Sequence, residues 1–368
     1  MSDTRFDTED FRIPVTVLTG FLGSGKTTLL NYWVKQPELA NCAVLINEFG
    51  AVGLDHHLVE KLDDNVVILE SGCVCCTVQG DLVNALRDLF MRAMRREIKP
   101  FQRVLIETTG LADPGPVLFT LRNDPFFAQR YRFDGTVTVV DVCHIAQQLT
   151  QQYEAVKQVA LADMLVLSKS DLADFGALPE VENLLQRINP MATRHITIKG
   201  QLSPSVLEHN GPFGSGSVRD PKEIRRWLQG AIAELGLASP MKPAAITLSP
   251  AVASQPISSA HSDVEAFCLR YDKPMPTARF LDGLRMVQMR YPERLLRFKA
   301  ILWLEEQDKP VVVHGVHDQL YPIMNLPEWP TGEPASELVF IMKQTDRQEV
   351  EDMLQEEFFP KYPRFQYE

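Results

Sequence analysis

The 368-residue sequence contains no apolar run long enough to cross a bilayer, and its 37 lysines and arginines are outnumbered by 48 aspartates and glutamates. Its first twelve residues are polar and acidic, without the apolar core of a secretory signal, so we expect a cytoplasmic protein. The formal net charge is −11, whereas phosphate contacts to nucleic acids need clustered lysine and arginine. We therefore expect neither a membrane nor a nucleic-acid partner.

Cysteine is scarce, and its spacing does not fit a disulfide framework. Of six cysteines, three fall within Cys73–Cys76, an arrangement that fits reduced thiols in a cytosol. Cys42, Cys143 and Cys268 are isolated, and we predict that all three are core residues. Internal repeats and low-complexity tracts are also missing, so fold class must be inferred from periodicity and motifs.

The composition is that of an ordinary globular protein, with 45% hydrophobic, 8% aromatic and 23% charged residues. The length favours two domains. We predict a disordered N-terminus at residues 1–12, an α/β domain at 13–238, a linker at 239–262 and a small α+β domain at 263–368. The linker carries four prolines among alanines and serines, which is typical of an irregular connection.

Short apolar runs alternate with helical patterns through the first domain. This alternation predicts a parallel sheet covered by helices on both faces, the architecture of a P-loop NTPase once a phosphate-binding loop is found. Polar motifs follow several of the strands, where open α/β sheets place their ligands. The strand candidates are Ile13–Thr19, Ala43–Ile46, Val66–Leu69, Val104–Ile106, Thr136–Val140, Met164–Leu167 and Arg194–Ile198.

The segment that follows the first strand matches the phosphate-loop pattern G-x-x-x-x-G-K-[ST]. Its glycines let backbone N–H groups turn toward phosphate oxygens, and the next helix presents its positive N-terminal end to them. Lys26 is expected to reach the β- and γ-phosphates, and the Thr27 hydroxyl to bind Mg²⁺. The predicted nucleotide-binding residues here are Gly20, Gly23, Ser24, Gly25, Lys26, Thr27 and Thr28.

Two further motifs follow strands. After Val104–Ile106, the Glu107 carboxylate can hold Mg²⁺ through its water shell, and the Gly110 N–H can approach the γ-phosphate. We therefore assign catalytic roles to Lys26, Thr27 and Glu107. Asp141 ends another strand and either supports the same site or caps the following helix.

The tetrapeptide Ser168-Lys169-Ser170-Asp171 resembles the guanine-reading motif N-K-x-D. An aspartate carboxylate can accept two hydrogen bonds from guanine, and adenine offers no such pair of donors. Serine replaces asparagine at position 168 and has less reach toward the base. Taken alone, the tetrapeptide fits a solvated turn equally well; together with the phosphate loop, it favours GTP, with Ser168, Lys169 and Asp171 around the base.

The thiols of Cys73, Cys75 and Cys76 are soft ligands that suit Zn²⁺ and can also hold Co²⁺ or Fe²⁺. Three cysteines supply at most three ligands, so the fourth must come from elsewhere or from water. Such an incomplete set favours an exchangeable metal site over a permanent structural one.

Four segments together resemble the CobW-type GTPases, a family related to the nickel chaperones UreG and HypB. They are Gly-Phe-Leu-Gly-Ser-Gly-Lys-Thr-Thr at 20–28, Asn-Glu-Phe-Gly at 47–50, Gly-Cys-Val-Cys-Cys-Thr at 72–77 and Glu-Thr-Thr-Gly-Leu-Ala-Asp-Pro at 107–114. The resemblance covers nearly the whole chain, since Leu295–Trp303 and Gly315–Tyr321 are similar to the family's C-terminal domain.

The resemblance implies a slow GTPase whose nucleotide state is coupled to transition-metal binding at the three thiols, and metal delivery to a client metalloprotein. Some YjiA-like members carry metal-binding glutamates where Ile46 and Ala51 stand here, whereas Glu48 remains as a candidate ligand. This chain also lacks the histidine-rich tract that several members have, and Lys299-Ala300 stands where Lys-Gly is common.

The leading hypothesis is a GTP-driven metallochaperone that uses GTP, Mg²⁺ and Zn²⁺ or Co²⁺ and acts as a monomer or weak homo-oligomer. One alternative is a P-loop small-molecule kinase, which would need an acceptor pocket and no cysteine cluster. Another is a non-catalytic metal sensor that uses nucleotide binding to recruit a partner.

Overall fold

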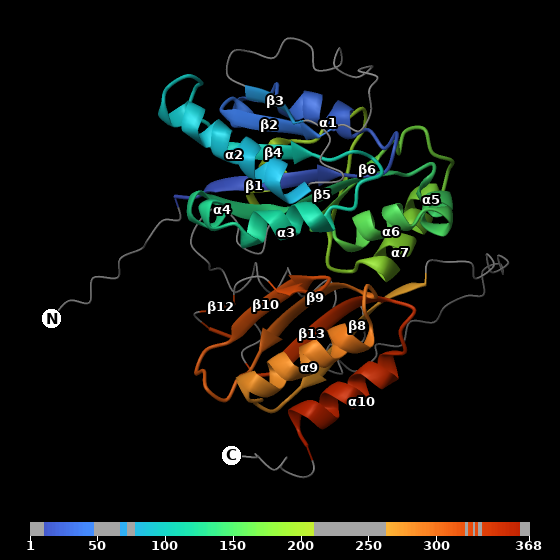
Figure 1. Ribbon diagram of the computed structural model, residues 1–368. Helices are drawn as coiled ribbons and strands as arrows, with labels where there is room; N and C mark the ends of the chain where they lie inside the picture. The colour runs from blue at the N-terminus through green and yellow to red at the C-terminus, as the bar shows by residue number, and fades with distance from the viewer. Residues whose placement is uncertain are drawn as a thin grey trace.

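The computed structural model describes residues 11–47, 67–71, 78–209, 263–320, 323–326, 328–329 and 333–360. They form two domains, each built on its own sheet (Figure 1). The predicted linker at 239–262, the predicted boundary at residue 238 and most of the predicted N-terminal segment lie outside the described residues. No helix within the described ranges is long and apolar enough to cross a membrane.

The first domain contains a seven-stranded sheet in the order β3-β2-β4-β1-β5-β6-β7, and every neighbouring pair is parallel. The predicted parallel α/β sheet is therefore confirmed. The strands are β1 (Ile13–Thr19), β2 (Cys42–Asn47), β3 (Val67–Ser71), β4 (Arg103–Glu107), β5 (Tyr131–Asp141), β6 (Met164–Ser168) and β7 (Thr193–Ile196).

Helices cover both faces of this sheet (Figure 1). Four of them were missed by periodicity, because α3 to α6 contain only six to nine residues each and a helical repeat needs a longer window. The elements are α1 (Lys26–Trp33), η1 (Pro37–Leu39), α2 (Val78–Met94), α3 (Gly115–Asn123), α4 (Pro125–Arg130), α5 (Ile145–Gln151), α6 (Tyr153–Ala160), α7 (Ala177–Ile188) and η2 (Pro204–His209).

Alternation along the strands divides the core between the two faces. In β1, Val15 and Val17 pack with α2, α3 and α4, whereas Leu18 packs with α1 on the opposite face. In β6, Leu165 and Leu167 pack with α5, α6 and α7. Because every neighbouring pair of strands is parallel, their carboxyl ends lie at one edge of the sheet.

The second domain is an antiparallel sheet in the order β11-β10-β9-β13-β8, with β12 paired to β10. Helices α9 and α10 cover one of its faces (Figure 1), as the predicted α+β domain requires. Its elements are β8 (Val264–Tyr271), α9 (Thr277–Arg290), β9 (Leu295–Leu302), β10 (Val311–Val316), β11 (Gln319–Leu320), β12 (Met324–Asn325), β13 (Ser336–Lys343) and α10 (Arg347–Phe358).

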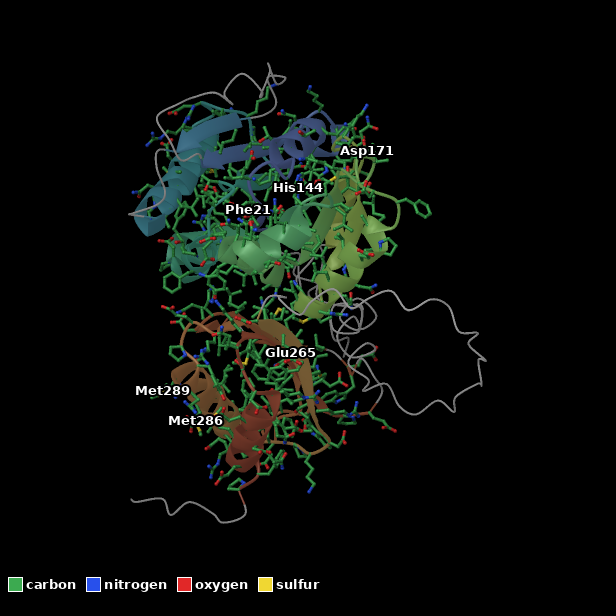
Figure 2. The ribbon with its side chains drawn as sticks, turned by 90° about the vertical axis from the view of Figure 1, so that its right-hand side faces the viewer. Phe21, His144, Asp171, Glu265, Met286 and Met289 are labelled. Atoms are coloured by element: carbon green, nitrogen blue, oxygen red, sulfur yellow. The ribbon has the colours of Figure 1, made fainter. Side chains whose placement is uncertain are left out.

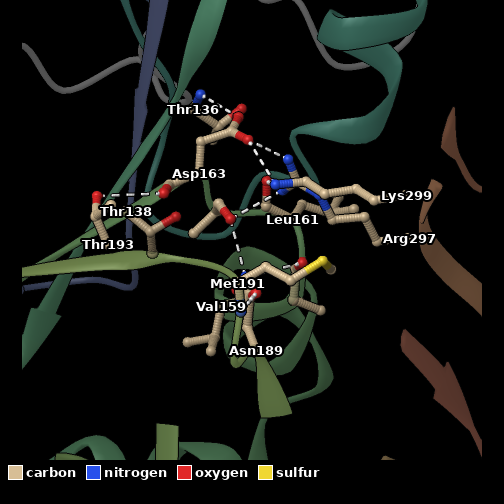
Figure 3. A network of polar contacts seen from close by, with 12 residues as sticks. Thr136, Thr138, Val159, Leu161, Asp163, Asn189, Met191, Thr193, Arg297 and Lys299 are labelled. Atoms are coloured by element: carbon tan, nitrogen blue, oxygen red, sulfur yellow. Dashed lines mark hydrogen bonds and ion pairs between the residues drawn. The ribbon is translucent and has the colours of Figure 1, made fainter. Parts of the chain in front are cut away.

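The other face of the second sheet packs on the first domain. One apolar cluster contains residues of α6 and α7 together with Leu296, Val339 and Ile341 of the second sheet. A polar network accompanies it: Arg297 donates hydrogen bonds to the carbonyl oxygens of Leu161 and Ala162 and forms an ion pair with Asp163 (Figure 3). The second domain is therefore bound to the first through both apolar and charged contacts.

Candidate nucleotide site

The phosphate loop connects β1 to α1 through three glycines with positive φ, at 141° for Gly20, 73° for Gly23 and 96° for Gly25. An added Cβ at Gly20 would lie 2.3 Å from the Val139 carbonyl oxygen. No other residue fits there, because the loop passes directly against β5. The backbone is thus shaped to turn its N–H groups inward ahead of α1, which is the arrangement that phosphate binding needs.

Lys26 is the first residue of α1, and its side chain is buried against the phosphate loop, with 8% of the residue's surface exposed. Its Nζ donates to the carbonyl oxygens of Gly20 at 2.8 Å and Phe21 at 3.2 Å. Burial lowers the pKa of Lys26, opposed by the nearby Glu107 carboxylate. A buried ammonium whose hydrogen bonds go to carbonyl oxygens would gain strongly from an anionic phosphate placed beside it.

Thr27 and Glu107 come together at the same edge of the sheet, 80 residues apart in the chain. The Thr27 hydroxyl donates to Glu107 Oε1 at 3.1 Å. Glu107 ends β4 and is 7% exposed. A hydroxyl and a carboxylate are oxygen ligands of the kind that Mg²⁺ takes, directly or through water, so these two side chains fit that ion.

The loop after Glu107 packs against the phosphate loop. A Cβ added at Gly110 would lie 2.7 Å from the Leu22 backbone nitrogen. Thr108 fixes the start of the loop, because its N–H donates to the Leu18 carbonyl at 2.9 Å and its hydroxyl to Thr19 Oγ1 at 2.8 Å. The backbone of Gly110 therefore lies beside the loop that carries Lys26.

Asp141 ends β5, and three groups converge on its carboxylate. Lys169 Nζ lies 2.8 Å and His144 Nδ1 2.9 Å from Oδ2, and the Cys143 N–H donates to Oδ1 at 2.9 Å. Burial opposes ionisation, but the hydrogen bonds from Lys169 and His144 outweigh it and lower the pKa of Asp141. Asp141 does not cap α5, because His144 occupies the N-cap position.

The structure places Ser168 and Asp171, the two ends of the tetrapeptide, in different surroundings. Ser168 is buried, and its hydroxyl lies 2.6 Å from the Ser24 carbonyl oxygen and 3.1 Å from that of Val140. Its hydrogen is thus directed at the protein backbone and ties β6 to the phosphate loop. Asp171 is exposed, and Figure 2 shows it in the same domain as Phe21 and His144. Thr28 is exposed on α1.

The predicted transition-metal ligands Cys73, Cys75, Cys76 and Glu48 lie outside the described residues. Among the residues that are described, no three His, Cys, Asp or Glu side chains form a group able to hold a metal ion. Cys42 and Cys268 are buried, as predicted. The prediction for Cys143 was wrong: it is exposed, because it lies in the turn after Asp141 and not within a strand.

His144 contacts the Asp141 carboxylate, although no motif in the sequence pointed to it. The available signal was its position, three residues after an aspartate that ends a strand. With Lys169 it forms a pair of part-exposed groups on a buried carboxylate, at the edge where Asp171 lies. Hydrogen bonding to one acceptor gives these two side chains fixed positions.

Similarity to known proteins covers both domains. Residues 14–195 match the CobW/HypB/UreG nucleotide-binding domain, and residues 264–357 match the C-terminal domain of the cobalamin synthesis protein cobW. The chain is 30% identical to the zinc chaperone YjiA of Escherichia coli over 339 residues, which is 92% of this chain and 96% of that protein. It is 37% identical over 197 residues to a zinc-regulated GTPase metalloprotein activator of Schizosaccharomyces pombe, covering 52% of this chain and 47% of that one.

The fold agrees with these similarities. The crystal structure of Zn(II)-bound YjiA GTPase from Escherichia coli superposes with a TM-score of 0.66 at 26% identity, covering 93% of this chain and 98% of that one.

Proposed function

Because the chain belongs to the CobW family of GTPases, we propose that it is a metallochaperone that couples GTP hydrolysis to transfer of a transition metal to a client protein. The observation that carries this proposal is the meeting of Lys26, Thr27 and Glu107 at one edge of the sheet. The full-length similarity to a zinc chaperone supports Zn²⁺ as the metal, with Co²⁺ as the second choice.

GTP is expected to lie along the phosphate loop, with Gly20, Gly23, Ser24 and Gly25 turned toward its phosphates. Lys26 is held at Gly20 and Phe21 and can bind the β- and γ-phosphates after a small movement of its ammonium. Mg²⁺, when bound, neutralises charge on the phosphates and polarises the γ-phosphoryl group. Thr27 and Glu107 would hold that ion, and the Gly110 N–H would donate to the γ-phosphate.

The guanine base is expected at Asp171, whose exposed carboxylate follows β6. Lys169 is fixed on Asp141 and can cover one face of the base. Ser168 acts differently from the asparagine of the usual motif, since its hydroxyl holds the Ser24 carbonyl of the phosphate loop. Guanine selection therefore depends on Asp171.

Cys73, Cys75 and Cys76 are proposed as the metal ligands, with Glu48 as a further candidate. Their proposed position near the nucleotide is supported by the place of β3, the strand that precedes them, in the sheet. The chain leaves β3 at Ser71, and β3 pairs in parallel with β2, which pairs in parallel with β4. Ser71 therefore lies at the same edge of the sheet as Glu107.

A metal titration tests this site. With a GTP analogue and Mg²⁺ present, Cys75→Ala is expected to weaken stoichiometric Zn²⁺ binding at least tenfold, because a three-thiolate site loses one ligand. Cys143→Ala, at an exposed cysteine, is the matched control and should bind Zn²⁺ like the wild type. Equal Zn²⁺ affinities for the Cys75 variant and the wild type would rule out the proposed thiol site.

Turnover assays separate this proposal from a kinase. We expect GTP hydrolysis to exceed ATP hydrolysis, and Asp171→Asn to reduce that preference, because an amide nitrogen replaces one acceptor oxygen facing guanine. Phosphate transfer to an added small-molecule acceptor in place of water would contradict the proposal.

A further inference from the structure

Gln158 is a polar residue in the core of the first domain, on the face of α6 that is otherwise apolar. It is 1% exposed and is one of the buried residues of α6, the others being Ala155, Val156, Val159 and Ala160. Its backbone carbonyl accepts a hydrogen bond from Thr138 Oγ1 of β5 at 2.8 Å, which fixes this turn of the helix to the sheet. A buried amide at such a position is costly unless its hydrogen bonds are made.

The Gln158 amide nitrogen makes its hydrogen bonds to the loop that follows Glu107, whereas Gln158 Oε1 has no hydrogen-bond partner among the described residues. Its Nε2 donates to the Gly110 carbonyl at 3.1 Å and to the Ala112 carbonyl at 3.1 Å. A primary amide has two N–H donors, so both are used on this one loop. The loop has no helix or strand of its own between Glu107 and Gly115, and its shape depends on such contacts.

The opposite side of the same loop touches the phosphate loop, where Gly110 packs against Leu22. Gly110 is thus held between the phosphate loop and α6, with its carbonyl bound to Gln158. The Gly110 carbonyl belongs to the planar Gly110–Leu111 peptide group, which is joined through the Gly110 Cα to the peptide group that carries the Gly110 N–H. Holding this carbonyl therefore limits how far the Gly110 Cα, and with it the Gly110 N–H, can move.

We propose that Gln158 is a positioning residue for GTP hydrolysis, which holds Gly110 where its N–H meets the γ-phosphate. This inference rests on the proposed nucleotide site. Gln158 itself touches neither GTP nor Mg²⁺; it acts by removing the freedom of the loop before the reaction. Catalysis of phosphoryl transfer depends mainly on such positioning of groups around the phosphate.

The preceding residue on α6 gives the loop a second, more exposed attachment. Lys157 Nζ lies 2.6 Å from Asp113 Oδ2, and the other oxygen of Asp113 accepts the Gly115 N–H at 2.9 Å. Lys157 and Asp113 line a cleft of about 690 Å³ between the two domains. Consecutive residues of one helix therefore hold the loop from its buried side and from the cleft.

The test compares Gln158→Met with the wild type. Methionine fills a similar volume but donates no hydrogen bond. We expect kcat for GTP to fall on the order of ten- to a hundredfold, as for other displaced positioning groups. The affinity for GTP analogue should fall relative to that for GDP, since only GTP has the γ-phosphate. Gln158→Glu should lower kcat and the relative affinity for GTP analogue at least as much, because an ionised carboxylate would face the carbonyl oxygens of Gly110 and Ala112.

Asn189→Leu is the matched control. Asn189 is also a buried amide, and its Nδ2 donates to the carbonyls of Val159, Ala160 and Ala162 at the C-terminal end of α6, close to Gln158 but away from the loop after Glu107 (Figure 3). This variant should lower the melting temperature while kcat and the ratio of GTP-analogue to GDP affinity stay within about twofold of the wild type, since no loop contact is lost.

The proposal is overturned if Gln158→Met changes the affinities for GDP and GTP analogue equally and lowers kcat no more than Asn189→Leu does. Should Gln158→Met fail to fold, Lys157→Met decides: we expect a smaller loss of kcat at unchanged melting temperature, and no loss would overturn the proposal. Unchanged GTP binding by Lys26→Ala would instead show that the proposed nucleotide site is wrong.

Discussion

Buried aspartates lie at both ends of the parallel strands in the seven-stranded sheet, but their partners differ. We call the side where the strands end the carboxyl edge and the side where they begin the amino edge. At the carboxyl edge, Asp141 holds Lys169 and His144, which are 35% and 61% exposed as side chains. At the amino edge, Asp163 holds Arg297 and Lys299 of the second domain, which are 4% and 1% exposed. Cationic side chains that are held by a carboxylate and remain exposed can contact a bound ligand. Cationic side chains that are buried together with their carboxylate can only hold parts of the protein together.

Other contacts agree with this division. Asp134, in the amino-terminal half of β5, is fully buried between Arg103 and Arg132. Burial raises the pKa of Asp134, and the two arginines oppose this effect. Asp163 also accepts two backbone hydrogen bonds (Figure 3). The Thr136 N–H donates to Asp163 Oδ2 at 3.0 Å, and the Thr193 N–H donates to the Asp163 carbonyl oxygen at 3.0 Å. The amino edge is thus a structural network with its hydrogen bonds directed inward.

Removing the carboxylate at the amino edge should have the largest effect. Asp163→Ala leaves Arg297 and Lys299 buried without their counter-charge, and we expect a loss of about 3–5 kcal/mol in the free energy of unfolding. Urea denaturation measures it. Asp272→Ala, at an exposed ion pair with Arg270, should cost less than about 1 kcal/mol. Similar losses for both variants would mean that the two domains are not joined through Asp163.

Removing a cation at the carboxyl edge should affect binding and not folding. Lys26→Ala is expected to weaken GTP binding by about ten- to a hundredfold, since charge-assisted hydrogen bonds contribute about 1.5–3 kcal/mol. Without nucleotide its melting temperature should stay the same or rise, because a buried ammonium is lost. Titration with a fluorescent GTP analogue measures the affinity, and Lys35→Met, at an exposed lysine just beyond α1, is the control.

The amino edge should also respond to pH. Burial, together with the Arg297 charge, lowers the pKa of Lys299 to about 7. The unfolded state then binds more protons than the folded state between about pH 7 and 10.5, so stability should rise with pH across this window, by at most about 1.4 kcal/mol per pH unit. Urea denaturation at pH 7, 8 and 9 measures the slope. Lys299→Met should lose this rise, and an identical slope in both proteins would contradict the assignment.

The smallest expected effect concerns the link between β6 and the phosphate loop. Ser168→Ala removes the hydroxyl that lies 2.6 Å from the Ser24 carbonyl. A single neutral hydrogen bond contributes about 0.5–1.5 kcal/mol, so GTP affinity should fall about two- to tenfold. Isothermal titration with a GTP analogue measures this change. Ser170→Ala, two residues further along, should bind within about twofold of the wild type, and an equal loss there would argue against a specific role for Ser168.

Sequence patterns predicted the strands well and the short helices poorly. Strand β1 has the predicted bounds, because its buried run of β-branched and apolar residues ends at a glycine. Helices α3 to α6 were missed, because each completes only two turns or so and owes its stability to packing. The exposure of Cys143 was also missed, because an isolated cysteine in the sequence does not indicate whether it lies in a turn or in the core.

The glycine loop at 20–27, the carboxylate that ends β4 and the tetrapeptide at 168–171 could be singled out from sequence as candidates because each depends on contiguous residues. Glycines at fixed spacing impose a local backbone shape, and that shape needs little help from the rest of the chain. Contacts between distant residues are different. No local pattern shows that Thr27 lies 3.1 Å from Glu107, that Gln158 holds Gly110, or that Arg297 reaches Asp163.

The sequence by itself determined the fold class, the nucleotide-binding loop and the family of this protein. The tertiary structure decided which polar residues stay accessible around Asp141 and which join the two domains. The physical reason is that the same aspartate or lysine can do either, and its role depends on burial and on neighbours that only folding brings together. Asp141 and Asp163 follow this rule at opposite edges of one sheet.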